Sequence, residues 1–213
     1  MDCDQRVDGM KRITHVILLV FTVLIFSTQN GLASSYEIDT KGGHAFIQFK
    51  ISHLGYSWLV GRFNRFSGEF EYDSKNPSDS SITVVIETES IDSNHAERDK
   101  HLRDEDFLDV NRFPEARFVS RSFTEREDGS ALLVGDLTLR GVTRSIEIEV
   151  DHVGSGSDPW GGYRRGFYGE TKLILADFGI TKYLGDASKE MELTLGIEGI
   201  RKKSNKASRK PGK

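Results

Sequence analysis

The 213-residue sequence contains a single cysteine, Cys3, so a disulfide bond within the chain is excluded. Cys3 lies in a leader segment that we expect to be removed, and the remaining chain then has no thiol available for catalysis or metal binding. Stability must therefore come from a hydrophobic core, and about 180 residues are enough to build one.

Long apolar runs are also absent. The longest, ITHVILLVFTVLIF (13–26), has 14 residues, whereas a membrane-spanning helix needs about 20. It follows Lys11-Arg12 and precedes a polar stretch that ends in Gly31-Leu32-Ala33. This order indicates a secretory signal peptide over residues 1–33, cleaved after Ala33. An uncleaved membrane anchor is the alternative, and translation starts at either Met1 or Met10.

The C-terminal segment contains no acidic residue. Residues 201–213 carry seven basic side chains and no acid, whereas residues 34–200 carry 19 basic and 30 acidic ones, a net charge of −11. The basic segment is typical of a disordered tail. It is either a solvated tail or a contact for anionic lipid headgroups; export disfavours nucleic acid as a partner.

Between the two ends, apolar and polar residues alternate with period two, which indicates antiparallel strands with one buried face. The runs that show this pattern are 44–52, 66–73, 81–88, 116–123, 131–140, 145–153 and 190–199. Turn residues separate them, as in REDGS (126–130) and GSGSDPWGG (154–162). About eight strands with short connections predict a sandwich or a barrel.

Glycines inside strands favour the barrel, because closure requires sharply bent strands. They occupy positions 68, 135, 169 and 196. Eight strands leave an interior that is either filled by side chains or open to one small ligand. Eight aromatic residues fall within residues 46–72, which suits a wide apolar interior. We therefore predict an all-β, eight-stranded barrel over residues 34–200.

The stretch SNHAERDKHLRDEDFLD (93–109) has the composition of a helix that Ser93 or Asn94 can cap. At 100° per residue, His95 and Asp99 share one side, and Glu97 and His101 lie nearly opposite. These four side chains therefore cannot surround one ion, and no metal site is predicted.

Leu102 gives this helix an inner face, with polar side chains around it and an Asp99–Arg103 pair to brace it. We expect the helix to cap one end of the barrel, with lining of the mouth as a second role. No Gly-x-Ser-x-Gly motif is present, so no catalytic residue is predicted. His53 and His101 are the histidines best suited to acid–base chemistry.

Several stretches in this order closely resemble the YceI family of exported proteins. They are HAFIQFKISHLGYSWLVGRF (44–63), TESIDSNHAERDKHLRDEDFLDVNRFPEARF (88–118), GDLTLRGVTR (135–144), DPWGGYRRGF (158–167) and DFGI (177–180). The resemblance implies an extended lipocalin-like barrel that binds a long isoprenoid lipid or similar amphiphile without a cofactor. It also implies a periplasmic location and, for some members, a homodimer.

From that resemblance we place candidate side chains around the lipid. The wall candidates are Ile47, Phe49, Trp58, Phe70, Ile86, Phe118, Leu137, Phe167 and Leu195. Trp58 and Tyr56 are expected near the entrance, each with one polar edge in water. Arg98 or Arg103 could meet a pyrophosphate or quinone head group, and an intramolecular contact is the alternative for both.

Three functions remain open at this point. The first is an exported carrier or store of an isoprenoid lipid, with transient membrane contact. The second is an enzyme that modifies a cavity-bound lipid through His101 or His53. The third is a stress-response protein that acts through a protein partner on the acidic surface.

Overall fold

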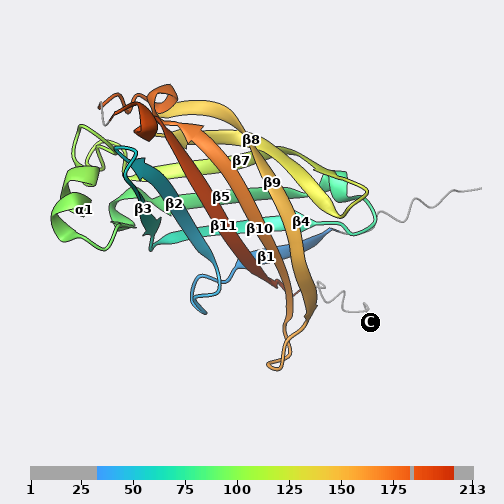
Figure 1. The fold of residues 1–213 in the computed structure, drawn as a ribbon. Helices are drawn as coiled ribbons and strands as arrows, with labels where there is room; N and C mark the ends of the chain where they lie inside the picture. Colours follow the sequence, from blue (N-terminus) through green and yellow to red (C-terminus); the bar gives the residue numbers. More distant parts are fainter. Residues whose placement is uncertain (1–32, 183–184, 204–213) are drawn as a thin grey trace, which may run out of the picture. The chain divides into compact units, whose positions relative to one another are not determined.

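The computed structural model describes residues 33–182 and 185–203, which form a β-barrel with one α-helix (Figure 1). The strands are β1 (Ser34–Ile38), β2 (Phe46–His53), β3 (Ser57–Phe63), β4 (Phe66–Tyr72), β5 (Ser81–Glu87), β6 (Ile91–Asp92), β7 (Glu115–Glu125), β8 (Ser130–Leu139), β9 (Val142–Ser157), β10 (Tyr163–Ile174) and β11 (Glu190–Arg201). The helices are α1 (Ala96–Arg103) and the 3-10 turns η1 (Pro77–Asp79), η2 (Thr88–Ser90), η3 (Leu175–Phe178) and η4 (Asp186–Ser188). Within the two described ranges, no helix is long and apolar enough to cross a membrane.

Eight strands close the barrel. Antiparallel pairing runs in the order β1-β4-β5-β7-β8-β9-β10-β11, and β11 then pairs with β1. The predicted eight-stranded barrel is therefore confirmed. Strands β2, β3 and β6 extend the wall from the same edge of β11: β1 pairs with residues 199–201 of β11, and β2 pairs with residues 191–196.

The alternating sequence pattern defines the barrel's interior. Each of the seven predicted runs matches a strand and extends at most two residues beyond it; the strands are β2, β4, β5, β7, β8, β9 and β11. In β8 every second residue is buried, so that Ala131, Leu133, Leu137 and Leu139 point into the core. The core of this unit is thus the inside of the barrel, where one face of each strand is removed from water.

Several strand glycines are covered by aromatic rings from a nearby strand. A Cβ atom at Gly135 would lie 2.4 Å from Cζ of Phe118, and one at Gly196 would lie 2.3 Å from Cε1 of Phe46. The glycines therefore do more than permit bending. They leave room for large rings to lie directly over the backbone of the wall.

Helix α1 lies at one end of the barrel (Figure 1) and confirms the predicted capping helix. Its N-cap is His95, whose Nδ1 accepts a hydrogen bond of 3.2 Å from the backbone N–H of Arg98. The predicted caps, Ser93 and Asn94, are wrong. The hydroxyl of Ser93 donates a hydrogen bond to the carboxylate of Asp99. Asn94 adopts the left-handed conformation (φ 61°) in the turn that leads into the helix.

The predicted Asp99–Arg103 pair is also wrong. Asp99 is buried, and its carboxylate accepts hydrogen bonds from the backbone N–H of Ser93, at 2.8 Å, and from the Ser93 hydroxyl. Arg103 donates instead to the carbonyl oxygens of Glu89 (2.8 Å) and Ile91 (2.7 Å). Both side chains thus anchor α1 to the segment that precedes it.

The predicted signal peptide lies outside the described residues, apart from Ala33, and so does residue 204 onward of the predicted tail. The first tail residues differ from the prediction. Arg201 is the last residue of β11, and the backbone N–H of Lys202 donates to the carbonyl of Ser35 at 2.8 Å. The barrel therefore continues through Lys202.

Candidate functional site: an apolar interior with two chambers

The barrel encloses two adjacent cavities of about 120 Å³ and about 290 Å³. We call them the first chamber and the second chamber. Both are lined by the same four side chains, Ile47, Ile86, Leu137 and Leu193, which therefore form a waist between them. Ligand pockets typically measure about 300–1,000 Å³, so the two chambers together reach the lower part of that range.

The first chamber is almost entirely apolar. Its walls come mainly from the inward faces of β4, β5, β7, β8, β9, β10 and β11. The few polar groups include the hydroxyl of Ser80, which is buried and has no hydrogen-bond partner in the described structure. Such a lining favours a hydrocarbon ligand, because it offers little to replace the hydration of a polar one.

Aromatic rings crowd one part of this chamber. Phe167 lies edge-on to Phe70 (5.7 Å between ring centroids) and close to Tyr72 (5.8 Å) and Phe123 (6.4 Å). The hydroxyl of Tyr72 donates to Glu125 at 2.7 Å. Burial, together with this hydrogen bond, raises the pKa of Tyr72 to about 12, so the ring stays neutral at any ordinary pH.

Eight of the nine predicted wall residues do line the interior. Those around the first chamber are Ile47, Phe70, Ile86, Phe118, Leu137, Phe167 and Leu195, and Phe49 lines the second chamber. All of these except Phe167 are apolar positions of the alternating runs, and the pleat of a strand sends such positions to one face. Their contact with a ligand stays a prediction.

Trp58 is the exception. Its side chain is 60% exposed on the outer face of β3, where Lys50 Nζ lies 4.6 Å from the ring centroid. The inward positions of β3 are Leu59, Gly61 and Phe63, so position 58 must face outward. Tyr56, predicted at the entrance, is 88% exposed in the β2–β3 turn and lines neither chamber.

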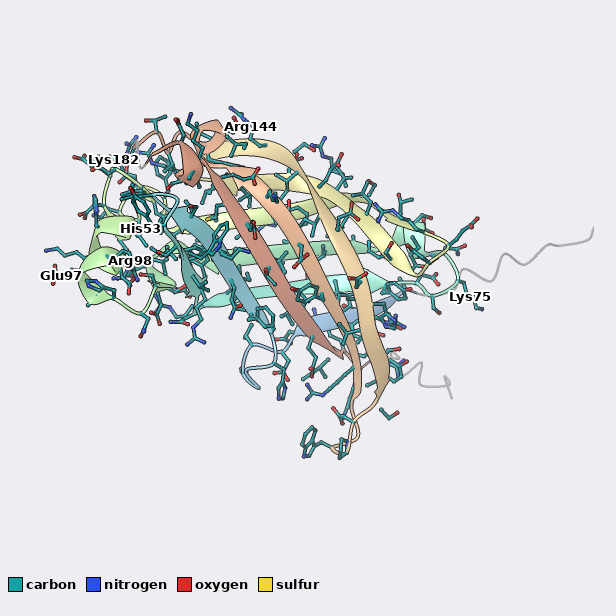
Figure 2. The ribbon with its side chains drawn as sticks, viewed as in Figure 1. His53, Lys75, Glu97, Arg98, Arg144 and Lys182 are labelled. Carbon is teal, nitrogen blue, oxygen red and sulfur yellow. The ribbon has the colours of Figure 1, made fainter. Side chains whose placement is uncertain are left out.

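The second chamber reaches the surface between the β2–β3 hairpin and α1. His53, Arg98 and His101 line it, and both histidines are exposed to solvent. Figure 2 shows His53 and Arg98 at this same end of the barrel. We call this opening the mouth. Its three nitrogen-bearing side chains give the otherwise apolar chamber a polar rim.

The two arginines that were candidates for binding a head group differ in their position relative to the second chamber. Arg103 lines neither chamber and donates to two backbone carbonyls, so it makes the intramolecular contact that was the alternative for it. Arg98 lines the second chamber, but donates from Nε to the Ser93 hydroxyl (2.7 Å) and from Nη2 to the Ser93 carbonyl (2.6 Å). Ser93 thus takes two of its five N–H donors.

The two histidines do not form a recognisable catalytic set. His101 Nε2 lies 3.5 Å from Asp106 Oδ2, and Lys182 Nζ holds the same oxygen at 2.6 Å. The hydrogen bonds from Lys182 and His101 lower the pKa of Asp106. The described lining of the second chamber includes no Ser, Thr, Tyr, Asp or Glu, so neither histidine has a nucleophile beside it there.

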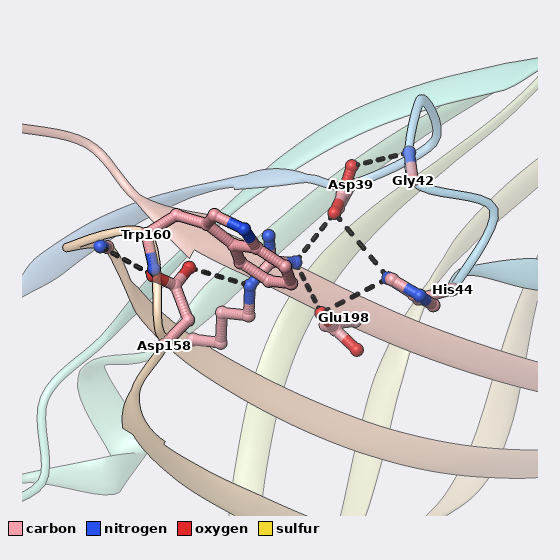
Figure 3. A network of polar contacts seen from close by, with 8 residues as sticks. Asp39, Gly42, His44, Asp158, Trp160 and Glu198 are labelled. Atoms are coloured by element: carbon pink, nitrogen blue, oxygen red, sulfur yellow. Dashed lines mark hydrogen bonds and ion pairs between the residues drawn. The ribbon is translucent and has the colours of Figure 1, made fainter.

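Sequence reasoning missed a polar cluster between the β1–β2 loop and the β9–β10 hairpin (Figure 3). Arg164 Nη1 lies 2.6 Å from Asp39 Oδ2 and 2.5 Å from Glu198 Oε1, and its Nε lies 2.8 Å from Asp158 Oδ2. The hydrogen bond from Arg164 is the main reason that the pKa of Asp39 is lowered. Only strand pairing over long sequence distances brings these residues together, and no local motif signals it.

This cluster also contains three side chains whose ligand atoms lie within 4.8 Å of one another, those of Asp39, His44 and Glu198. A metal ion would need both carboxylates, but one nitrogen of Arg164 already donates to each of them. The guanidinium therefore supplies the positive charge at this point. The set is a structural ion-pair network and does not fit a metal centre.

The wall has a split on its outer side between β9 and β10. The pairing of β9 with β10 ends at Glu149 and Glu170. Beyond these residues β9 stays paired with β8, and β10 stays paired with β11. Past this point, the hydroxyl of Thr171 donates to the carbonyl of Glu147 at 2.6 Å. A groove of about 630 Å³ occupies the split, and the buried ring of Phe178 from η3 lines it.

Comparison with known proteins identifies the family. A family model described as the YceI-like domain matches residues 36–199. The chain belongs to the YceI family. It is 51% identical over 188 residues to a UPF0312 protein of Yersinia enterocolitica, covering 87% of this chain and 97% of that one. A UPF0312 protein of Pseudomonas aeruginosa is 54% identical over 177 residues, covering 83% and 92%.

Solved structures show the same YceI fold at lower sequence identity. BcnA of Burkholderia cenocepacia superposes with a TM-score of 0.67 at 18% identity, covering 76% of this chain and 98% of BcnA. The YceI protein of Campylobacter jejuni gives 0.64 at 24% identity, covering 72% and 91%. A polyisoprenoid-binding domain from Saccharophagus degradans gives 0.56 at 14% identity, covering 79% and 99%.

Proposed function

We propose that this YceI-family chain binds one long isoprenoid lipid, or a similar amphiphile of quinone or prenyl type, inside the barrel. The observation that carries the proposal is the pair of adjacent apolar chambers that share four lining side chains, with His53, Arg98 and His101 at the mouth of the second. The hydrocarbon chain would extend from the second chamber through the waist into the first. Its head group would stay at the mouth, near His53, Arg98 and His101.

Apolar burial supplies the binding energy. Each buried CH₂ group contributes roughly 0.8 kcal/mol, so one five-carbon isoprene unit contributes roughly 4 kcal/mol before costs. Ordering a flexible chain inside a channel offsets part of that gain. The branched, rigid isoprene unit loses less rotational freedom than a saturated chain of equal length, which favours it as the occupant.

The comparisons support this ligand class. The Saccharophagus degradans domain, which shares the fold, is described as polyisoprenoid-binding. We further propose that the chain is exported to the periplasm and stores or carries its lipid there, because the sequence begins with a signal-peptide pattern. A homodimer is part of the same proposal. No cofactor or chemical step is needed for this role.

The proposal is tested by native mass spectrometry of the chain purified from membrane-containing cells, followed by organic extraction and identification of the lipid. We expect one isoprenoid lipid per barrel. An empty barrel that also takes up no added quinone or prenyl lipid would contradict the proposal. The interior would then be a packed core, and the acidic surface would become the place to search for a protein partner.

A matched pair of variants ties the lipid to the interior. Leu195→Lys places a charge in the first chamber, whereas Thr194→Lys places the same charge one residue away, on the outer groove. Only Leu195→Lys should lose the lipid, while circular dichroism and thermal melting show that both variants are folded. Equal lipid content in the two variants would place the ligand elsewhere.

An enzyme acting through the mouth predicts a different result. His101→Ala would then abolish turnover of the bound lipid while the lipid itself remained in the barrel. The carrier proposal expects instead that the extracted lipid is chemically identical in the wild-type chain and in His101→Ala. Mass spectrometry of the two extracts separates these outcomes.

A further inference from the structure

The β2–β3 hairpin carries a cluster of exposed apolar side chains. Leu54 is 52% exposed, Tyr56 88%, Trp58 60% and Val60 54%. We call these four residues the hairpin patch. They are half of the large hydrophobic side chains that the described structure exposes, and they fall within seven residues. Such clustering marks an interaction surface, whereas single exposed apolar residues are ordinary.

The hairpin patch lies at the edge of the mouth. Ile51, His53 and Leu59 are on the same hairpin and line the second chamber from inside. Strands β2 and β3 are paired along their length, with Ile47 opposite Phe63 at one end and His53 opposite Ser57 at the other. Inner and outer side chains therefore alternate along both strands. The inner face of the hairpin is thus the chamber wall, and its tip and outer face are the patch.

The residue types match the surface of a lipid bilayer. Tyr and Trp combine an apolar ring with a polar edge, and they concentrate where hydrocarbon meets headgroups. Lys50, whose ammonium lies over the Trp58 ring and pairs with Glu192 at 2.6 Å, adds a long amphipathic side chain beside these rings. Leu54 and Val60 add aliphatic surface that a headgroup layer can bury.

The mouth supplies the second argument for a bilayer. A chain of isoprene units that crossed open water to reach the chamber would expose apolar surface at roughly 0.8 kcal/mol per CH₂. A mouth pressed against a bilayer avoids that exposure. This argument rests on the proposed function, because it assumes a lipid cargo.

We propose that the hairpin patch inserts into the interface of a lipid bilayer and thereby places the mouth of the second chamber directly against the membrane. The barrel then stands with α1 and the β2–β3 hairpin toward the lipid. The β9–β10 hairpin, which carries Trp160, belongs to the part of the barrel that stays in water.

The sequence offers a clean test, because Trp58 and Trp160 are its only tryptophans. Trp160→Phe leaves Trp58 as the sole reporter, and Trp58→Phe leaves Trp160, which is 78% exposed. Each chain is mixed with phosphatidylcholine vesicles that contain or lack brominated acyl chains, and flotation measures the bound fraction. We expect brominated lipid to quench Trp58 at least two-fold and to leave Trp160 unchanged. No quenching of Trp58 in vesicle-bound chain, or quenching of Trp160 instead, would overturn the proposal.

A charge in the patch provides the matched variant. Tyr56→Asp should lower partitioning into vesicles at least ten-fold, whereas Val153→Asp, at a residue 71% exposed on β9, should not. Partitioning by apolar insertion should persist in 0.5 M salt, while attraction through the basic C-terminal segment would be screened. Loss of binding in salt, or an equal effect of the two variants, would contradict insertion of the patch.

Two further readouts distinguish membrane insertion from self-association and from lipid binding in the interior. If a second copy of the chain covers the patch, light scattering will show a dimer that Tyr56→Asp dissociates, with vesicle partitioning unchanged; that result overturns the proposal. Native mass spectrometry on the same samples reports lipid content. If the chain carries lipid but Trp58 is not quenched, membrane insertion of the patch is contradicted and the proposed function is not. If the patch inserts but the barrel contains no lipid, only the proposed function is contradicted.

Discussion

Glycine and phenylalanine are matched across neighbouring strands of the barrel wall. Gly61 lies beneath the ring of Phe49, and Gly135 lies beneath the ring of Phe118. The missing Cβ lets each ring lie against the wall instead of projecting into the interior. Both phenylalanines also line a chamber. The glycines therefore control the free volume of the interior as well as the curvature of the strands.

Replacing Gly135 by alanine should destabilise the barrel by about 1–3 kcal/mol, because the new Cβ overpacks the wall. It would lie 2.4 Å from Cζ of Phe118 and 2.6 Å from the carbonyl oxygen of Val119, and the backbone oxygen cannot move aside. Urea unfolding measures the change. Gly154→Ala is the control, since a Cβ added at Gly154 would have no atom within 4 Å, and its stability should be unchanged or slightly higher. Equal losses would show that the close approach is not the cause.

The sequence predicts whether a single side chain faces the interior where apolar and polar residues alternate strictly. In FSGEFEYD (66–73) the period-two pattern placed Phe70 inside, as observed. In SWLVGRF (57–63) three apolar residues are consecutive, so the pattern does not tell which face is buried. Trp58 was predicted on the cavity wall near the entrance, and the strand register puts it on the outer face.

At the scale of elements, Arg164 ties the β9–β10 hairpin to the β1–β2 loop. The pKa of Asp39 is lowered by the hydrogen bond from Arg164 and by that from the backbone N–H of Gly42. A carboxyl group whose pKa is lower in the folded state stabilises the fold at pH values above its ordinary pKa, here 3.8. That stability is lost as the pH falls below this value.

The free energy of unfolding should therefore decrease between about pH 5 and pH 3, as the unfolded chain takes up protons that Asp39 resists. Asp39→Asn should be about 1–3 kcal/mol less stable at pH 7, because a charge-assisted hydrogen bond is weakened, and its stability should depend less on pH in this window. Denaturant unfolding at a series of pH values measures both effects. Asp79→Asn, at an exposed position in η1, serves as control, and a pH profile for Asp39→Asn identical to that of the wild type would refute the assignment.

The turn η3 packs the ring of Phe178, which is 2% exposed, against the split between β9 and β10. Phe178→Ala should cost about 3–5 kcal/mol, because a cavity remains where the strands are not hydrogen-bonded to each other. Ile174→Ala, four residues earlier and 43% exposed, should cost far less. Thermal unfolding of both variants is the measurement, and a small loss for Phe178→Ala would mean that the packing of η3 at the split contributes little to stability.

Elements were easier to predict than the contacts between them. The charged composition of residues 93–109 indicated α1, but its cap depends on the backbone angle of Asn94 and on the hydrogen bonds of Ser93. Neither can be read from residue types. The Arg164 cluster depends on the pairing of β1, β10 and β11, which joins residues from both ends of the chain.

At the scale of the whole barrel, the waist controls how much of the interior one ligand can occupy. Leu193→Trp should narrow the waist and confine the lipid to the second chamber, so that shorter prenyl chains are bound in preference to longer ones. Overpacking should cost about 1–3 kcal/mol of stability. Native mass spectrometry with a mixture of chain lengths measures the preference. Thr194→Trp, at the next position and on the outer groove, should leave it unchanged; the same preference in both variants would exclude the waist as the determinant.

The sequence predicted the barrel and most of the lining, because both follow from the alternation along each strand. It did not predict whether the interior is open. That depends on the sum of all inward side chains, and a few methyl groups decide between a packed core and a chamber. The mouth was only partly predictable: α1 was expected there, but the hairpin patch depends on the register of β2 and β3.

Strand β11 pairs with three others, β10, β2 and β1, and it is the last strand of the barrel to be synthesised. Until the ribosome has made it, β1 and β2 have no partner on that side, and the ring stays open. The nascent chain therefore carries several unpaired strand edges and an uncovered apolar face, which are the features that promote aggregation. Barrel closure is thus a late event that follows synthesis of β11.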